Sequence, residues 1–389
     1  RTCKHMKMLG KFKKTVGKME GVTTISTPPS YWTTSGNYVL NRILTGSLSR
    51  AVGQGRVMGL VGPSGSGKSF LLSNMMRQAQ QEKNAFVLAI DSENALDDEF
   101  VGKIGVDVDE ANYMYISVIT IPHIKKIVSE FVNDYKASEE TRPVMIAIDS
   151  LGMLLTDTEF DLLEKGENKG DQGQRAKQLK SVLRGFVQLI KNLNIQIIIT
   201  DQVYAANADA IKNGTADGNW VVNGAVKYSL SNVVMITKLK LRDGAAGEVG
   251  DVVGIRMKCE AIKTRFTKPF QKVVVEVPYE TGMDRMSGFK EVAMEMGILE
   301  KRGSYVRIVS TQDQFYWKDL NQERIDLLIK EANEMSHLSI GRSLDDEEEE
   351  GETEQSIAKR RIANAKKFLQ SNPDYIPEGS AIDTSDIED

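Results

Sequence analysis

The stretch VMGLVGPSGSGKSF, residues 57–70, is the strongest indication of the fold in this sequence. It joins a short apolar run to GPSGSGKS, which matches the phosphate-loop pattern G-x-x-x-x-G-K-[ST]. Small residues here let backbone N–H groups turn inward around phosphates, and the following helix adds positive potential at its N-terminus. The pattern predicts a strand, a phosphate loop and a helix, with Lys68 on the outer phosphates and Ser69 on magnesium. The residues expected to cradle the nucleotide are Gly62, Pro63, Ser64, Gly65, Ser66, Gly67, Lys68 and Ser69.

Further apolar runs are short and nearly uninterrupted, as expected of strands buried on both faces. Helical segments separate them, and this alternation predicts an α/β fold with a mostly parallel central sheet covered on both faces. Three later runs lack helices between them and are expected to continue the sheet in antiparallel fashion. The expected strands are 57–61, 86–90, 143–148 and 195–199, the expected helices 69–82, 122–137 and 174–192, and the later runs 232–239, 254–262 and 271–277.

Two carboxylates complete the predicted nucleotide site. Asp149 ends the run 143–148, a position from which a carboxylate binds magnesium through water. Hydrolysis also needs a group that orients or deprotonates water beside the terminal phosphate. Glu93 follows the run 86–90 directly, which puts it at the carboxyl edge of the sheet, where ligands of open α/β sheets bind. Alone, Glu93 would be read as a surface glutamate; beside a phosphate loop, it is the candidate base of a nucleotide triphosphatase.

Composition narrows the class of protein. The 389 residues are 41% hydrophobic and 27% charged, which allows one large globular domain with appendages. No window approaches 18 apolar residues and the N-terminus lacks the apolar core of a secretory signal, so we expect no membrane span, no export and a cytoplasmic location. The two cysteines form no CxxC pair and the three histidines no ligand spacing, which argues against disulfides, structural zinc and histidine-based catalysis.

The N-terminal end is basic. Residues 1–18 hold seven Lys or Arg and no acid, while Leu9, Phe12, Val16 and Met19 recur at helical spacing. We expect an amphipathic helical arm over residues 1–34 that docks on another copy of the protein. A targeting peptide or a frayed end is the alternative.

The C-terminal end is acidic. Residues 345–389 hold 14 acidic and 5 basic side chains, and the densest block is DDEEEEGETE. Such a block repels itself and is expected to stay solvated. It is either a solubilising tail or a mimic of polyanion that competes for a basic groove. The expected organisation is an arm over 1–34, an ATPase core over 35–310, a small C-terminal region over 311–344 and the tail over 345–389, with helix-like stretches at 319–335 and 356–370.

Several separated motifs follow one another along roughly residues 35–310. They are GSLSRAVGQGRVMGLVGPSGSGKS, IDSENALDDEF, IAIDSLGMLLT, DQGQRAKQLKSVLRGF, TDQVY, NGAVKY and AIKTRFTKPF. In this order they resemble the RecA family of recombinases, and most closely its phage branch, the UvsX-like proteins, which is more specific than a phosphate loop alone. The resemblance implies a RecA-like phosphate-loop ATPase core that uses ATP and Mg²⁺.

The resemblance gives roles to residues around the nucleotide. It implies that Glu93 activates the attacking water and that Asp97 and Phe100 sandwich adenine, where a ring face stacks without base-specific hydrogen bonds. It also implies that Gln202, at the junction of a strand and a loop, senses the terminal phosphate. Gln202 matches the cellular branch of the family, whereas the T4-type phage proteins tend to carry histidine there.

Other residues resemble subunit contacts of the family. Lys263 and Arg265 lie two residues apart and are expected on the same side of a strand. At this family position paired cations reach the terminal phosphate of ATP held by the adjacent subunit. In isolation the pair equally fits an exposed strand face. Lys227 and Tyr228 fall at another subunit-contact position.

The resemblance also implies two DNA-binding loops, one over about 157–173 and the other over 203–224. Lys177 and Arg184 are seven residues apart, share a helical face and match basic DNA-contacting positions. A solvated helix face is the alternative. In the second loop the candidates are Lys212 and Trp220.

The function implied is that of an ATP-dependent recombinase. It would form helical filaments of itself on single-stranded DNA, hydrolyse ATP in response to DNA, and exchange the strand with a homologous duplex. Single-strand-binding and mediator proteins are further candidate partners, and no membrane is expected. The alternatives are another motor of this fold, such as a ring helicase, or a nucleotide-switched recombination mediator.

Overall fold

A computed structural model describes residues 2–19, 28–167, 173–206, 217, 219–243 and 250–339. The stretch 356–370, the acidic tail and Lys212 lie outside these residues. The chain divides into two compact units, 1–292 and 293–389, so residues 293–310 belong to the second unit and not to the unit that contains the phosphate loop. Among the described helices, none is long and apolar enough to span a bilayer.

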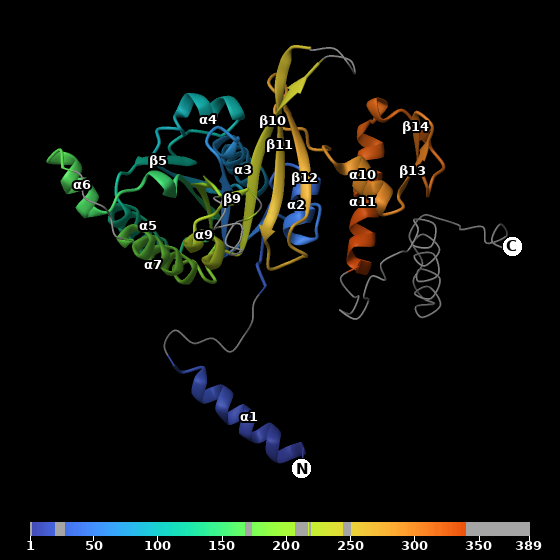
Figure 1. Ribbon diagram of the computed structural model, residues 1–389. Coiled ribbons are helices and arrows are strands. Elements are labelled where there is room, and N and C mark those ends of the chain that lie inside the picture. The colour runs from blue at the N-terminus through green and yellow to red at the C-terminus, as the bar shows by residue number, and fades with distance from the viewer. Residues whose placement is uncertain are drawn as a thin grey trace. The chain divides into compact units, whose positions relative to one another are not determined.

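An eight-stranded sheet forms the centre of the first unit (Figure 1). Its order is β12-β11-β10-β3-β7-β6-β4-β5, and the six strands from β10 to β5 are parallel to one another. The predicted mostly parallel sheet is therefore confirmed. Of the later runs, only β11 and β12 are antiparallel additions, because β10 pairs in parallel with β3. The strands are β3 (Val57–Gly62), β4 (Phe86–Asp91), β5 (Tyr113–Ser117), β6 (Val144–Asp149), β7 (Ile195–Gln202), β10 (Asn232–Arg242), β11 (Val252–Lys263) and β12 (Lys272–Pro278).

Alternate strand residues face two helical layers. On one face, Val61, Ile146 and Ile197 join a buried apolar cluster with α5 (Ile121–Ala137) and α7 (Gln174–Leu189). The residues between them face the opposite layer, where α3 (Lys68–Lys83) packs over β3, β4, β6 and β7. Burial on both faces explains why these strands are continuously apolar in sequence.

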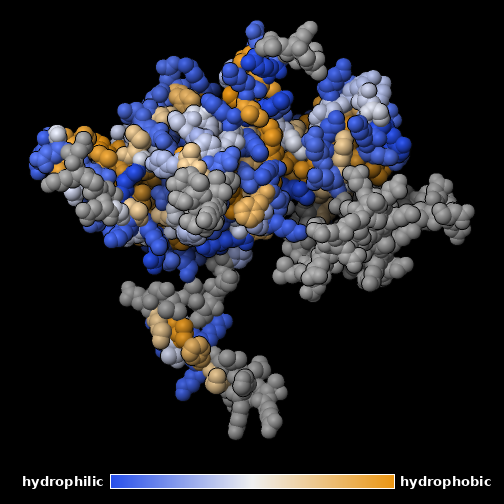
Figure 2. All heavy atoms as spheres, viewed as in Figure 1, coloured by the Kyte–Doolittle hydropathy of each residue, from blue (hydrophilic) through white to orange (hydrophobic). Residues whose placement is uncertain are grey.

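The segment expected as the first DNA-binding loop is partly helical. Residues Asp157–Glu164 form α6, whose first turn is stabilised by a reciprocal capping box between Thr156 and Glu159. The expectation of a loop throughout 157–173 is therefore wrong for its first half; residues 168–172 lie outside the described part. No residue of α6 is buried, and Leu163 is 64% exposed. Figure 2 shows apolar atoms on this helix.

The remaining elements are short, apart from the terminal helices. In the second unit the predicted helix 319–335 is found at Gln322–Ser339. In the first unit, β8 and β9 form an antiparallel pair inside the segment 203–224 that was expected to be a loop. The other elements are α1 (Thr2–Val16), β1 (Trp32–Thr33), α2 (Tyr38–Thr45), β2 (Val52–Gly53), α4 (Asp98–Ile104), η1 (Leu151–Met153), β8 (Tyr204–Ala205), β9 (Trp220–Val221), α9 (Gly224–Ser229), α10 (Phe289–Glu295), β13 (Leu299–Arg302), β14 (Tyr305–Ile308), β15 (Gln314–Phe315), η2 (Trp317–Asp319) and α11 (Gln322–Ser339).

Candidate nucleotide and DNA-binding site

The phosphate loop connects β3 to α3 and packs against the β10–β11 hairpin. Gly65 and Gly67 have φ of 67° and 98°, in the left-handed region that favours glycine. A Cβ at Gly62 would lie 2.2 Å from the Ile236 carbonyl oxygen, and one at Gly67 would lie 2.9 Å from the Met257 sulfur. The glycines are thus required by backbone conformation and by the close approach of the hairpin.

Lys68 is the buried cation of this loop. Its Nζ donates hydrogen bonds of 3.0 Å to the carbonyl oxygens of Gly62 and Pro63. Burial lowers the pKa of Lys68, and the charges of nearby acids, Asp149 and Glu93 among them, oppose that shift. An ammonium has three donors, so one N–H remains to meet a phosphate.

Asp149, at the end of β6, has the surroundings of a magnesium-binding carboxylate. The Thr200 hydroxyl donates to its Oδ1, and the Ser69 side chain is near enough to lower its pKa. Its Oδ2 is buried and has no hydrogen-bond partner among the described residues. Burial raises the pKa of Asp149, and the bonds from Ser69 and Thr200 oppose the rise. An unpaired buried carboxylate oxygen beside a hydroxyl fits Mg²⁺, which takes oxygen ligands and needs only one or two from the protein beside phosphates and water.

The candidate base Glu93 is held by two side chains, one at the end of β7 and one directly after β6. Both the Ser150 hydroxyl and the Gln202 amide donate to its Oε1, and the Gln202 Nε2 distance is 3.2 Å. The Glu93 backbone N–H donates to Asp91 at 2.8 Å, which fixes the turn after β4. Gln202 pairs in register with Gly62, the first residue of the phosphate loop. The structure therefore brings Glu93, Gln202 and the phosphate loop together.

Two residues near this edge were missed by the sequence analysis. Asp201 is buried, which raises its pKa to about 6, although the Gln202 N–H and the Asn223 side chain bond to it. Arg175, at the start of α7, donates to the carbonyl oxygens of Leu154, Leu151 and Gly152 in and beside η1. Asp201 had a sequence signal, because it lies next to the end of the apolar strand β7, whereas Arg175 on the first turn of α7 had none.

The adenine candidates lie at the start of α4. Asp97 caps this helix, and its carboxylate accepts a 2.9 Å hydrogen bond from the Phe100 N–H. The cap fixes the Asp97 side chain within one turn of the partly exposed Phe100 ring. This pairing is local and follows from the sequence D-D-E-F.

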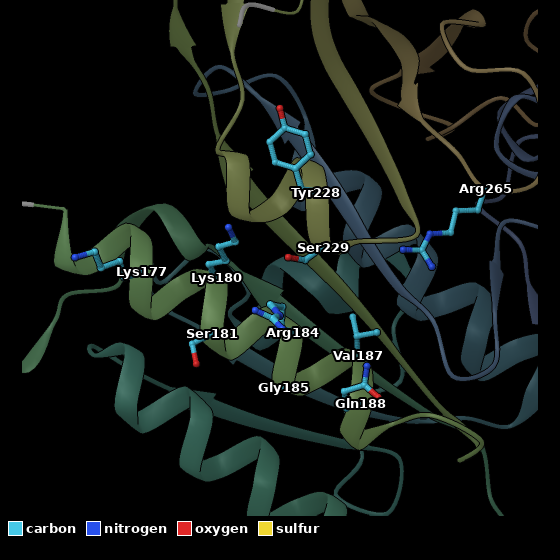
Figure 3. Close-up of a pocket in the computed structure, with 10 residues that line it drawn as sticks. All are labelled: Lys177, Lys180, Ser181, Arg184, Gly185, Val187, Gln188, Tyr228, Ser229 and Arg265. Carbon is cyan, nitrogen blue, oxygen red and sulfur yellow. The ribbon is translucent and has the colours of Figure 1, made fainter. Parts of the chain in front are cut away.

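The basic face of α7 lines a cavity of about 1000 Å³. Figure 3 shows Lys177, Lys180 and Arg184 on successive turns of α7, with Tyr228 on α9 and Arg265 at the far side. No carboxylate is among the residues that line this cavity. Residues expected to bind DNA and residues expected at a subunit contact thus share one cationic hollow. Lys180 was missed, although its spacing from Lys177 and Arg184 places it on the same face.

The two aromatic residues of the β8–β9 pair differ in exposure. Trp220 is partly buried and packs against the main apolar cluster, whereas Tyr204 is 64% exposed. A ring must be accessible to stack on a base. In this conformation Tyr204 has the more accessible ring.

The expected subunit-contact residues are anchored within the chain. Lys263 ends β11, and its Nζ donates to the Tyr228 carbonyl at 3.0 Å. Burial lowers the pKa of Lys263, and the charge of Arg265 lowers it further. Arg265 lies two residues beyond the end of β11, so the expectation that both project from one strand is wrong. The strand ends there because the chain turns, with the Thr264 hydroxyl bonded to the Leu44 carbonyl at 2.7 Å. Lys227 forms an ion pair of 2.7 Å with Asp217.

Comparisons with known proteins agree with the α/β fold described above. The RecA N-terminal domain family model matches residues 14–284, more than half of the chain. A protein named RecA from Pseudomonas putida is 26% identical over 261 residues, which are 65% of this chain and 66% of that protein. Another, from Xylella fastidiosa (strain M12), is 25% identical over 257 residues, 65% of this chain and 68% of that protein. The chain thus spans about two thirds of the length of these curated relatives.

Proposed function

The chain belongs to the RecA family, and from this premise we propose that it is an ATP-dependent DNA recombinase. Its ATP-bound subunits form a helical filament on single-stranded DNA and exchange that strand with a homologous duplex. The observation that carries the proposal is the hydrogen bond from Gln202 to Glu93. It joins the candidate hydrolytic base to the strand that leads directly into the β8–β9 pair.

ATP hydrolysis is assigned to residues at the carboxyl edge of the sheet. Glu93 orients or deprotonates the water that attacks the terminal phosphate. Lys68, together with Lys263 and Arg265 of a neighbouring copy, neutralises the charge that develops on the phosphate oxygens. Ser69 and Asp149 would hold Mg²⁺, which supplies further charge neutralisation at those oxygens.

DNA binding is proposed for the cationic face of α7. Lys177, Lys180 and Arg184 neutralise phosphates, while Tyr204 offers a ring for stacking. Phosphate contacts and stacking carry little base information, so binding is expected to tolerate any sequence and to weaken with salt.

Gln202 links the two activities. Its side chain bonds Glu93, and the next N–H, of Val203, donates to the carbonyl of Gly62 at 3.3 Å. A change at the terminal phosphate therefore acts on the same short segment that positions β8. Nucleotide state and DNA grip are coupled through this hinge.

Self-assembly is proposed from exposed groups as well as from the family. Tyr228 is 73% exposed on α9, and the arm helix α1 carries Phe12 at 64% exposure. Exposed aromatic residues beside cations are typical of contacts between proteins. We assign Arg265, Lys263, Tyr228 and Lys227 to the contact with the subunit that holds the neighbouring ATP.

Within the family we assign the chain to the UvsX-like phage branch. The order of its motifs and their residues support this assignment. Host cytoplasm, a single-strand-binding protein and a loading mediator are then the expected surroundings. Mixing the purified chain with single-stranded DNA already coated by such a protein tests this assignment. Filament formation that needs an added mediator supports it.

One set of assays separates the recombinase from its alternatives. ATP hydrolysis is measured with and without single-stranded DNA, followed by strand exchange with homologous and non-homologous duplexes. The proposal expects DNA-stimulated hydrolysis and exchange only with homology. A ring helicase would unwind without homology and form closed hexamers, and a mediator would hardly hydrolyse ATP. Either result would replace the proposed function.

A further inference from the structure

The short helix α9 is fixed by side chains at three points. It spans only Gly224–Ser229, and helices of this length are not stable in isolation. At its start, Asn223 caps the helix, and its side-chain oxygen accepts a 2.9 Å hydrogen bond from the Ala225 N–H. In its middle, Lys227 pairs with Asp217, and near its end the Tyr228 carbonyl accepts from Lys263. The position of α9 is therefore set by these contacts.

The Asp217–Lys227 pair is the least solvated ion pair in the described part of the chain. The Lys227 Nζ lies 2.7 and 2.8 Å from the two carboxylate oxygens, and the two side chains are 25% and 9% exposed. Partial desolvation makes such a pair stronger than one on the open surface. The Asp217 backbone exchanges hydrogen bonds of 2.7 and 3.2 Å with Trp220 of β9. Asp217 thus ties α9 to the β8–β9 pair that follows Gln202.

The hydrogen bond between Tyr228 and Lys263 orients the Lys263 ammonium and uses only one of its N–H donors. The Tyr228 carbonyl lies in the last turn of α9, where carbonyl groups have no partner within the helix. It accepts one N–H of the Lys263 ammonium, and two further N–H groups remain for another acceptor. A lysine side chain has many rotamers, so holding it in one place reduces the entropy lost when it meets a phosphate.

We propose that Asp217 is a positioning residue for Lys263. Its carboxylate holds Lys227, which fixes α9, and the Tyr228 carbonyl of α9 holds the Lys263 ammonium ready for the terminal phosphate of a neighbouring copy. This inference rests on the proposed function, in which Lys263 acts on ATP bound by the adjacent subunit. Through Asp217, the β8–β9 pair then helps to hold Lys263, the cation that completes the nucleotide site of the neighbouring subunit.

A double-mutant cycle between Asp217 and Lys263 tests the inference. The maximal DNA-stimulated ATPase rate is measured for Asp217→Asn, Lys263→Met and the double variant. We expect Asp217→Asn to lower the rate about tenfold and the double variant to be no slower than Lys263→Met alone, because residues that act through one another are not additive. Additive losses, or an Asp217→Asn rate equal to wild type, would overturn the inference.

A conservative replacement provides the second measurement. The variant Asp217→Glu keeps a carboxylate for Lys227, and we expect it to keep most of the wild-type rate that Asp217→Asn loses. A folded Asp217→Glu protein as slow as Lys263→Met contradicts the inference, also where Asp217→Asn alone does not fold. The matched control is Glu130→Gln, which removes the exposed Lys126–Glu130 pair of 3.9 Å on α5 and is expected to keep the wild-type rate.

The two proposals fail in different ways. Absence of DNA-stimulated hydrolysis in the wild-type protein would remove the proposed function. Stimulated hydrolysis that depends on Lys263 but not on Asp217 would remove only the positioning role.

Discussion

The Gln202 amide donates a 3.2 Å hydrogen bond to the Glu93 carboxylate, although 109 residues separate them in the chain. β7 lies between β3 and β6, and β4 follows β6, so the ends of these strands meet at one edge of the sheet. The contact puts the candidate base under the control of a residue that also adjoins the phosphate loop.

Replacing Glu93 by Gln keeps the hydrogen bond to Gln202 possible but removes the base. We expect the ATPase rate to fall by about 100-fold or more, the range of general-base contributions. ATP binding is retained, so filaments on single-stranded DNA are expected to last longer, which electron microscopy after ATP dilution measures. Glu110→Gln, on the exposed turn before β5, is the control. Unaltered hydrolysis in Glu93→Gln would remove the assigned base.

Replacing Gln202 by Ala breaks the link between nucleotide and DNA. Coupling free energies between sites are about 1–3 kcal/mol, so we expect the ratio of DNA-stimulated to DNA-free ATPase rates to fall by about five- to 100-fold. Affinity for single-stranded DNA should also become insensitive to the choice of ATP or ADP. Fluorescence anisotropy of a labelled oligonucleotide measures this. A ratio that stays at the wild-type value would exclude Gln202 as the hinge.

The cations of α7 are expected to act through phosphates. Lys177→Ala, Lys180→Ala and Arg184→Ala should each weaken single-stranded DNA binding equally for all sequences. Each should also reduce the slope of log affinity against log salt by about 0.7, the value for one contact on a single strand. Lys136→Ala, exposed on α5, is the matched control. A salt slope that does not change in Lys180→Ala would show that Lys180 lies on a solvated helix face and does not contact DNA.

Asp201 is predicted to make folding stability depend on pH. Its pKa is raised by burial from 3.8 to about 6, so between these values the folded protein keeps a proton that the unfolded chain has released. Stability therefore falls as the pH rises from about 4 to about 6, by about 3 kcal/mol when fully developed. Asp201→Asn cannot ionise and should lack this part of the pH dependence.

Denaturant unfolding at several pH values checks this prediction. The difference between Asp201→Asn and wild type should grow in favour of the variant between pH 4 and pH 6 and then stay constant. A difference that does not vary with pH would show that Asp201 has the same pKa in the folded and unfolded protein, and would contradict the raised pKa.

Local patterns predicted the parts of this protein that depend on short-range chemistry. The phosphate loop, the continuously apolar strands, the helices between them and the carboxylate after β6 all follow from residues adjacent in the chain. A loop that needs glycine for φ and a strand that is buried on both faces show these requirements directly in their sequence. The local pattern failed at α6, where a capping box in T-D-T-E starts a helix within the expected loop.

Contacts between residues far apart in the chain could not be predicted in this way. Strand order places Gln202 against Glu93, Thr200 against Asp149 and α9 between Asp217 and Lys263, and it leaves Arg265 beyond the end of its strand. Side-chain periodicity states which residues are buried but not which strands become neighbours. Residues adjacent in the chain are therefore enough to predict the nucleotide-binding elements, whereas packing of the sheet brings the groups on those elements together.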